Sequence, residues 1–191
     1  LVIPEGHEFV LSFLGAVMAG AVPVPIFPRA TFKAAREYVE TVSHIAAASR
    51  AVLLLCSETN EALVEPARAD VPSLQHIRSV ERLFAPELTA LSFAPPAITQ
   101  DDVCFLQFTS GSTSRPKGVV VTHRNLIANA TAFLGPHGLR RNEQDVGVSW
   151  LPLYHDMGLI GFILGPLIVD IPVVILPTAT FARGPRVWLE T

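Results

Sequence analysis

Short apolar runs of strand length recur along the chain, and segments with helical periodicity separate them. Apolar residues spaced for one helix face occur at 8–19 and 31–50, whereas the continuous runs are typical of strands covered by neighbouring layers. The predicted strands include "AVLLLC" (51–56), "VCFLQF" (103–108), "VVVT" (119–122), "DVGVSWL" (145–151) and "PVVILP" (172–177). Strands that alternate with helices predict an α/β fold with largely parallel sheets and flanking helices.

The uncharged stretch 9–28 has the length of a membrane-spanning helix. Three prolines, Pro23, Pro25 and Pro28, fall in its last six positions, and proline cannot continue a helix. We therefore expect a buried helix over 8–19, a strand over 21–27 and no membrane span. A second apolar run, 157–169, is predicted to be a buried helix.

Composition excludes several classes of protein. Half of the 191 residues are hydrophobic, so the chain is not intrinsically disordered, and a net charge of −3 argues against a nucleic-acid binder. Two cysteines, Cys56 and Cys104, are too few for a disulfide scaffold and are expected in the core of a cytoplasmic protein. Only 16% of the residues are charged, below the usual quarter, which suggests either membrane contact or a missing part that covers apolar faces.

A loop rich in hydroxyl groups and glycine, "TSGSTSRPKG" (109–118), is the first candidate site. Hydroxyl donors, backbone that a ligand can approach closely, and the positive charge of Arg115 and Lys117 suit a polyphosphate. The loop is not a Walker motif, because Lys117 stands between Pro116 and Gly118. Composition alone leaves a polar surface turn as an equally good interpretation.

The order of residues in "FTSGSTSRPKGVVVTHRNL" resembles the phosphate-binding signature of the adenylate-forming, or AMP-binding, superfamily. Thr122 is a plausible N-cap for the helix that begins at "HRN". By this resemblance the β- and γ-phosphates of ATP are bound by Thr109, Ser110, Gly111, Ser112, Thr113 and Lys117. Gly118 adds backbone that a ligand can approach closely.

A second motif, "SWLPLYHDMGLIG" (149–161), most closely resembles the fatty acyl-AMP ligases, and "FLGAVMAGAVPVPIFP" (13–28) matches the family's early helix and strand. The resemblance implies that His155 lies near the substrate carboxylate and the α-phosphate and is catalytic together with Lys117. A lone histidine beside an apolar helix is more often structural, so both interpretations of His155 stay open. For Asp156 we favour a helix cap, and for Tyr154 and Trp150 core packing.

The resemblance implies a reaction and a set of partners. A fatty acid and ATP, with Mg2+, give an acyl-adenylate and pyrophosphate, and the acyl group passes to an acyl carrier protein. In the family, later segments of the chain bind adenine, ribose and magnesium. A small C-terminal domain, also later in the chain, carries the catalytic lysine. Residues 1–191 are thus expected to form an incomplete N-terminal domain, in which 85–102 is a linker between two layers. We expect this part to be inactive alone and to expose apolar patches.

Three alternatives remain open. An acyl-CoA ligase has the same chemistry with coenzyme A as acceptor. A non-catalytic module that keeps the fold belongs to a different class, and the intact phosphate loop argues against it. An amino-acid-activating domain is disfavoured by "YHDMG" (154–158). The remaining histidines show no metal-ligand spacing, and no metal-binding residue is predicted within this chain.

Overall fold

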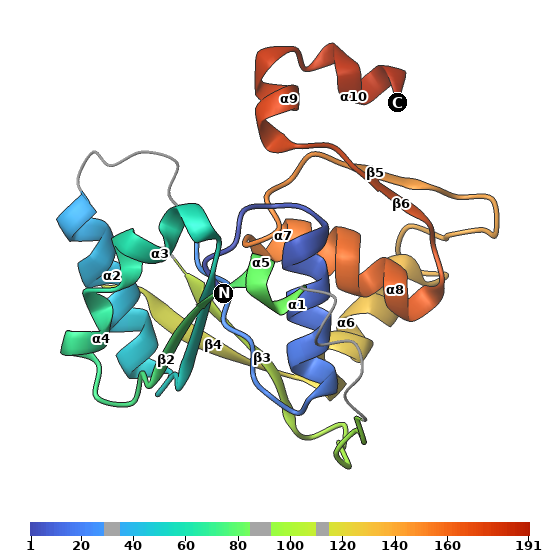
Figure 1. Cartoon of the computed structure of the whole chain (residues 1–191). Helices are drawn as coiled ribbons and strands as arrows, with labels where there is room; N and C mark the ends of the chain where they lie inside the picture. The colour runs from blue at the N-terminus through green and yellow to red at the C-terminus, as the bar shows by residue number, and fades with distance from the viewer. Residues whose placement is uncertain (29–34, 85–92, 110–114) are drawn as a thin grey trace.

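The computed structural model describes residues 1–28, 35–84, 93–109 and 115–191 (Figure 1). Helices and strands alternate along the chain, and both the first and the last strand pair are parallel. This arrangement confirms the predicted α/β fold with largely parallel sheets. The middle pair is an exception, because it forms an antiparallel hairpin.

The first parallel pair joins β1 (Leu53–Cys56) to β2 (His76–Ser79). Between them the chain forms α3 (Glu58–Val64) and α4 (Ala67–Asp70), and α2 (Ala35–Ala48) packs against both helices. One hydrophobic core lies among these elements and includes Val42, Ile45, Leu54, Val64 and Ile77. The sequence predicted that 51–56 is covered on both faces, and this holds for its later part, because Leu54 and Cys56 lie in this core and Leu55 lies in a second one. Val52 and Leu53, at the start of the run, are about half exposed.

Helix α1 (His7–Met18) begins the second hydrophobic core. Its Phe9 and Phe13 are fully buried, and the Phe13 ring meets the edge of Phe105 with centroids 5.6 Å apart. Phe105 lies in β3 (Val103–Thr109), which pairs with β4 (Lys117–Thr122). This contact fixes α1 against the hairpin that carries the loop of interest.

The segment 21–27 is not a strand, contrary to the sequence prediction. It runs extended and makes isolated backbone hydrogen bonds on two sides, from Leu106 N–H to the Pro23 carbonyl and from the backbone nitrogen of Leu1 to the Val24 carbonyl. Pro23 and Pro25 have no N–H group, so a continuous ladder cannot form here.

Helix α6 (His123–Leu134) follows β4 directly, as the sequence predicted. Thr122 is its N-cap: the hydroxyl oxygen accepts from the Asn125 N–H, and the Asn125 side-chain oxygen accepts from the Thr122 N–H. This reciprocal capping box satisfies two backbone donors at the helix start. Leu126 then packs into the second core, and Ala130 is also buried.

The last parallel pair is β5 (Gly147–Ser149) with β6 (Val173–Ile175). The predicted single helix between them is three consecutive pieces, α7 (Asp156–Leu159), a π-helical turn η2 (Ile160–Leu164) and α8 (Gly165–Val169). One face is buried through Leu159 and Leu164, whereas Met157 and Leu167 are exposed. The predicted fully buried helix is therefore buried on one face only, and its other face exposes apolar side chains.

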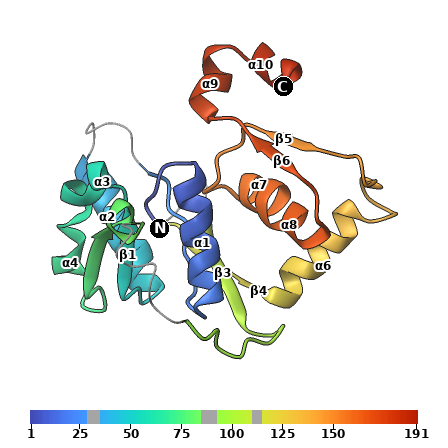
Figure 2. The same ribbon diagram turned by 45° about the vertical axis from the view of Figure 1, so that its right-hand side comes forward.

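Two further short helices lie at the end of the described chain. These two are α9 (Thr178–Arg183), which no sequence pattern indicated, and α10 (Arg186–Glu190), which begins after Gly184-Pro185, a pair typical of a helix start. Figures 1 and 2 both show α9 and α10 beyond β5 and β6, apart from the other helices. The remaining helix is α5 (Val80–Leu83).

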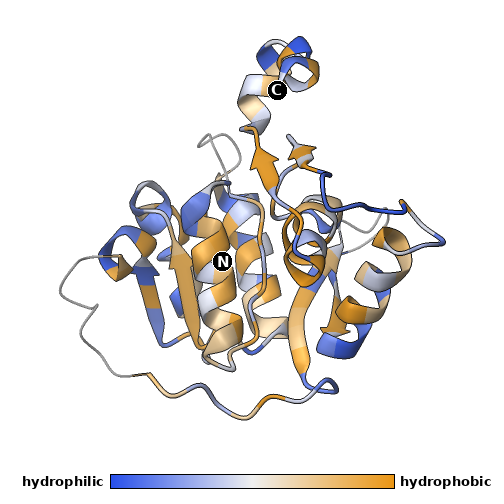
Figure 3. Ribbon diagram, turned by 90° about the vertical axis from the view of Figure 1, so that its right-hand side faces the viewer, coloured by the Kyte–Doolittle hydropathy of each residue, from blue (hydrophilic) through white to orange (hydrophobic). Residues whose placement is uncertain are grey.

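Large apolar side chains are exposed in several places, as the low fraction of charged residues led us to expect. On β4, Val119 and Val120 are 49% and 56% exposed, and Leu189 of α10 is 82% exposed. Figure 3 shows that the ribbons of the strands are mostly hydrophobic. Within the described ranges, every helix is too short or too polar to cross a lipid bilayer.

Candidate functional site

The β3–β4 hairpin brings together the two ends of the predicted phosphate loop. Thr109, the last residue of β3, is the cross-strand partner of Lys117, the first residue of β4, and both are exposed. A residue with a hydroxyl group and a residue with an ammonium group are thus neighbours where the two strands lead into the loop. The predicted ligands Ser110, Gly111, Ser112 and Thr113 lie outside the described residues.

Gly118 has a packing role in addition to the predicted close approach of a ligand. It pairs across the hairpin with Phe108, whose ring lies over it. A Cβ at position 118 would lie 2.9 Å from the Phe108 Cζ, so any larger residue would displace the ring. Glycine leaves room for the aromatic ring above its backbone.

Helix α2 contacts the exit of the loop through a side-chain hydrogen bond. The Nε2 of His44 lies 3.0 Å from the carbonyl oxygen of Pro116, the residue before Lys117. The two residues are 72 positions apart in the sequence, so the contact joins the first layer of the fold to the hairpin. Sequence reasoning missed His44, which lies among small and apolar residues of a helix without any motif.

A side chain of β3 connects the loop to the second motif. The amide nitrogen of Gln107 donates to the carbonyl oxygen of Tyr154 across 3.0 Å. Its amide oxygen is buried and has no partner among the described residues. The strand that enters the phosphate loop is thereby fixed to the turn before His155, which brings the two predicted motifs into one region of the molecule.

His155 occupies the N-cap position of α7, whereas Asp156, which the sequence predicted to cap this helix, is its first residue and accepts a hydrogen bond from the Met157 N–H. The Met157 N–H donates to Asp156 Oδ1 across 2.7 Å and lies 3.4 Å from His155 Nδ1. Nδ1 is itself 2.6 Å from Asp156 Oδ1, a separation that requires a proton between the two atoms. The contact between His155 Nδ1 and Asp156 Oδ1 determines where the proton lies, because the Met157 N–H already donates to Asp156.

Asp156 therefore orients the His155 ring, and the histidine is available to a ligand. The side chain of His155 is 65% exposed, so its ring is not part of the hydrophobic core. With the proton on Nδ1, the neutral ring presents Nε2 as a hydrogen-bond acceptor. This arrangement suits either a group that contacts a substrate or a surface histidine.

Tyr154 packs against another aromatic ring and lines a small cavity. Its ring meets Phe27 edge to face with centroids 5.1 Å apart, and both line a cavity of about 330 Å³ with Phe108 and Tyr38. Burial raises the pKa of the Tyr154 phenol, and the charge of Glu5 adds to this effect. The phenol thus stays protonated at neutral pH and is a hydrogen-bond donor at the edge of the loop region.

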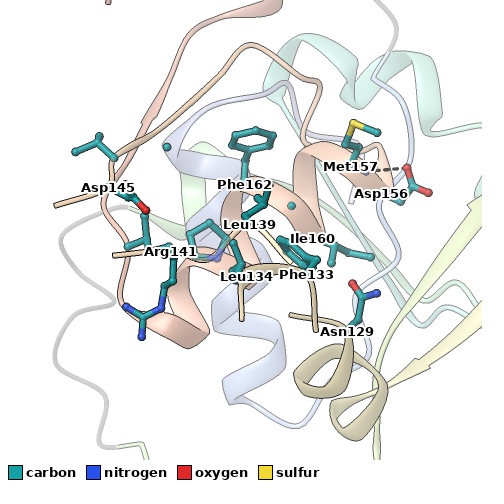
Figure 4. Close-up of a pocket in the computed structure, with 15 residues that line it drawn as sticks. Asn129, Phe133, Leu134, Leu139, Arg141, Asp145, Asp156, Met157, Ile160 and Phe162 are labelled. Carbon is teal, nitrogen blue, oxygen red and sulfur yellow. Dashed lines mark hydrogen bonds between the residues drawn. The ribbon is translucent and has the colours of Figure 1, made fainter. Parts of the chain in front are cut away.

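A larger, mainly apolar cavity begins directly after His155. Its volume is about 650 Å³, and Figure 4 shows Asp156 and Met157 at one side and Arg141 and Asp145 at the opposite side. The wall between them is formed by apolar side chains of α6 and the π-helical turn, including Phe133, Ile160 and Phe162. A cavity of this size and polarity fits an apolar small molecule.

Trp150 lies in neither of the two hydrophobic cores, although the sequence favoured core packing. It stacks on Phe181 with centroids 3.7 Å apart, and Trp188 meets both rings edge to face. This cluster holds α9 and α10 against β5. It was not predictable from the sequence, because α9 gave no recognisable pattern.

The described residues contain no group of three or more His, Cys, Asp or Glu side chains that could hold a metal ion. Cys56 and Cys104 are both buried free thiols, as predicted. Burial raises the pKa of Cys56 to about 12 and that of Cys104 to about 11, so neither is a nucleophile at neutral pH. The polar groups of the hairpin and of the Tyr154–Met157 turn are therefore the chemically useful ones.

Comparison with known proteins matches this arrangement to one family. The chain is 38% identical over 189 residues to a putative acyl-CoA synthetase of Caulobacter vibrioides, which covers 96% of the chain and 31% of that protein. It is 29% identical to the medium-chain-fatty-acid–[acyl-carrier-protein] ligase JamA of Moorena producens, over 100% of the chain and 32% of the relative.

A solved structure shows the same fold. It comes from a study of fatty acyl-adenylate ligases from E. coli and L. pneumophila, with a TM-score of 0.85, 34% identity, and coverage of 98% of this chain and 33% of the other. The chain thus spans about a third of the length of these proteins. The sequence profile described as AMP-binding enzyme matches residues 1–191, and the chain belongs to this adenylate-forming family.

Proposed function

We propose that the protein carrying this chain activates a fatty acid with ATP, forming an acyl-adenylate and pyrophosphate. The observation that carries the proposal is the Gln107–Tyr154 hydrogen bond, because it holds the phosphate loop and the His155 turn in one region. Adenylation needs both parts: one binds the leaving pyrophosphate, and the other receives the carboxylate.

In this proposal the loop binds the phosphates of ATP. Thr109, Ser110, Gly111, Ser112 and Thr113 contribute hydroxyl and amide donors, Lys117 contributes positive charge, and Gly118 permits close approach of the backbone. A carboxylate oxygen of the fatty acid attacks the α-phosphorus, and the bond to the bridging oxygen of pyrophosphate breaks. Donors placed around the phosphates stabilise the charge that builds up on the leaving group.

We assign His155 to the carboxylate side of the reaction. Its exposed ring, oriented by Asp156, is placed to contact the carboxylate or the α-phosphate. Mg2+, which the resemblance implies, would neutralise part of the phosphate charge. We place its protein ligands in the family's later segments, since the described residues hold no suitable cluster.

The acyl chain is assigned to the apolar cavity that begins at Met157. Gly161 lines this cavity, and a Cβ built there meets only the Met157 Cγ, at 4.0 Å. A Gly161→Leu variant should fill the cavity and shift the preferred chain length towards shorter acids, whereas Gly161→Ala should change it little. An unchanged chain-length profile in Gly161→Leu would place the acyl chain elsewhere.

The acceptor of the acyl group is proposed to be the phosphopantetheine thiol of an acyl carrier protein. The JamA relative is named as a ligase of this kind. The Caulobacter relative is named as an acyl-CoA synthetase, so coenzyme A is the second candidate. Acylation of holo carrier protein but not of coenzyme A, followed by mass spectrometry, would support the first acceptor, and the reverse result the second.

The experiment for adenylation is ATP–pyrophosphate exchange by the complete gene product with fatty acids of graded length. Lys117→Gln should raise the KM for ATP about tenfold or more through loss of a charge-assisted contact, whereas the exposed Arg68→Gln should match the wild type. Residues 1–191 alone should show no exchange, because we expect the adenine, ribose and magnesium sites to lie in later segments. We also expect the protein to be cytoplasmic.

A further inference from the structure

One hydrogen bond connects α2 to the exit of the phosphate loop. His44 Nε2 lies 3.0 Å from the carbonyl oxygen of Pro116. Because a carbonyl oxygen only accepts, Nε2 carries a proton and donates it. The ring is partly buried, so water competes less for this bond than for one on the open surface.

The position of the acceptor makes this bond important for the loop. Pro116 has no N–H group, so its carbonyl is its only backbone hydrogen-bonding group. The same carbonyl belongs to the planar peptide unit that contains the nitrogen of Lys117. A hydrogen bond that holds this oxygen therefore also sets the orientation of the peptide plane, and with it the direction in which the Lys117 side chain leaves the backbone. Lys117 is the residue of β4 that pairs with Thr109.

The surroundings explain why such a support is needed. A cavity of about 570 Å³ separates α2 from the loop exit, and charged side chains line it, including Glu37, Glu40, Asp70 and Arg115. The cavity leaves little direct packing between the helix and the loop exit. The His44 hydrogen bond crosses from the helix to the loop exit at the edge of this cavity.

We propose that His44 is a positioning residue for ATP binding: it orients the Pro116–Lys117 peptide so that Lys117 presents its ammonium group to the phosphates. The proposal rests on the proposed function of the loop. It assigns a role in nucleotide binding to a helix that carries no sequence motif, and it predicts an effect on ATP that leaves the fatty acid site unchanged.

The test compares two variants of similar size in the complete gene product. His44→Phe keeps a ring but has no donor, whereas the His44→Gln side chain can still donate an N–H. The exposed His137→Phe, in the loop after α6, is the matched control. Exchange kinetics give KM for ATP, KM for the fatty acid and kcat, and calorimetry with MgATP alone gives Kd without turnover.

His44→Phe should raise both the KM and the Kd for MgATP about tenfold, with kcat and the KM for the fatty acid within about twofold of the wild type. His44→Gln should recover most of the loss, and His137→Phe should show none. Unchanged ATP affinity in His44→Phe, or equal impairment in Phe and Gln variants, would overturn the proposal. An absence of exchange by the wild type would instead contradict the proposed function, and calorimetry would still decide the role of His44.

Discussion

The side-chain amide of Gln107 donates to the carbonyl oxygen of Tyr154 across 3.0 Å. Gln107 lies two residues before Thr109, where the phosphate loop begins, and Tyr154 lies one residue before His155. The hydrogen bond thus joins in space the two motifs that the resemblance identified separately in the sequence. A polar residue in the otherwise apolar strand "VCFLQF" is explained by this contact.

Replacing Gln107 should impair catalysis more than folding. Gln107→Leu removes the donor and leaves the Tyr154 carbonyl without it, and Gln107→Glu adds a negative charge beside that oxygen. We expect kcat/KM for the fatty acid to fall about tenfold in Gln107→Leu and further in Gln107→Glu, measured by pyrophosphate exchange. The exposed Gln144→Leu serves as control, and wild-type kinetics in Gln107→Glu would contradict the account.

Two glycines near α7 should differ sharply in their tolerance of a methyl group. A Cβ at Gly158 would overlap the carbonyl oxygen of Pro152, whereas one at Gly161 meets nothing closer than 4.0 Å. Gly158→Ala should lower the free energy of unfolding by about 2 kcal/mol or more, because the backbone itself must shift. Gly161→Ala should stay within about 0.5 kcal/mol of the wild type, as measured by denaturant unfolding. Equal stability of the two variants would show that the turn is packed differently.

The capping box of α6 gives a third prediction. Thr122→Ala loses the acceptor for the Asn125 N–H and should destabilise the protein by about 1 kcal/mol. Thr122→Ser keeps the hydroxyl and should cost much less. Thermal unfolding of the three proteins checks this order, and an alanine variant as stable as the serine variant would refute the role of the cap.

The two buried thiols make stability depend on alkaline pH. Burial raises the pKa of Cys56 to about 12 and that of Cys104 to about 11, above the 9.0 of an ordinary thiol. The unfolded chain therefore releases these protons first as the pH rises. Stability from this source is fully present below about pH 9 and is lost between pH 9 and the folded-state values.

The same thiols should be unreactive in the native protein. We expect negligible reaction of Cys56 and Cys104 with a thiol reagent at pH 8, and rapid reaction of both in denaturant. Cys104→Ala should leave one such protected thiol. Fast modification of the native protein would show that these strands open readily.

Much of the fold was predictable because hydrophobic periodicity determines it locally. The bounds of α1, within one residue, and the N-cap Thr122 followed from residue order. The predicted strand over 21–27 was wrong, since backbone donors are missing at Pro23 and Pro25 and apolar composition does not reveal how many ladder bonds can form. The π-helical turn was also not predictable, because a π turn keeps the same apolar residues and changes only their hydrogen bonds.

For the candidate site, the sequence identified the loop and the His155 motif but not the residues that position them. Gln107 and His44 act through single hydrogen bonds to backbone carbonyls, at separations of 47 and 72 residues. Such contacts depend on tertiary packing and leave no local pattern. Only the polarity of Gln107 in an apolar strand was a usable signal.

Pyrophosphate exchange tests the central claim most directly. The complete gene product, supplied with MgATP, labelled pyrophosphate and a series of fatty acids, should incorporate label into ATP only when a fatty acid is present. Lys117→Gln should suppress exchange at limiting ATP, and Arg68→Gln should not. No acid-dependent exchange at any chain length, with ATP binding retained, would contradict fatty acid adenylation by this protein.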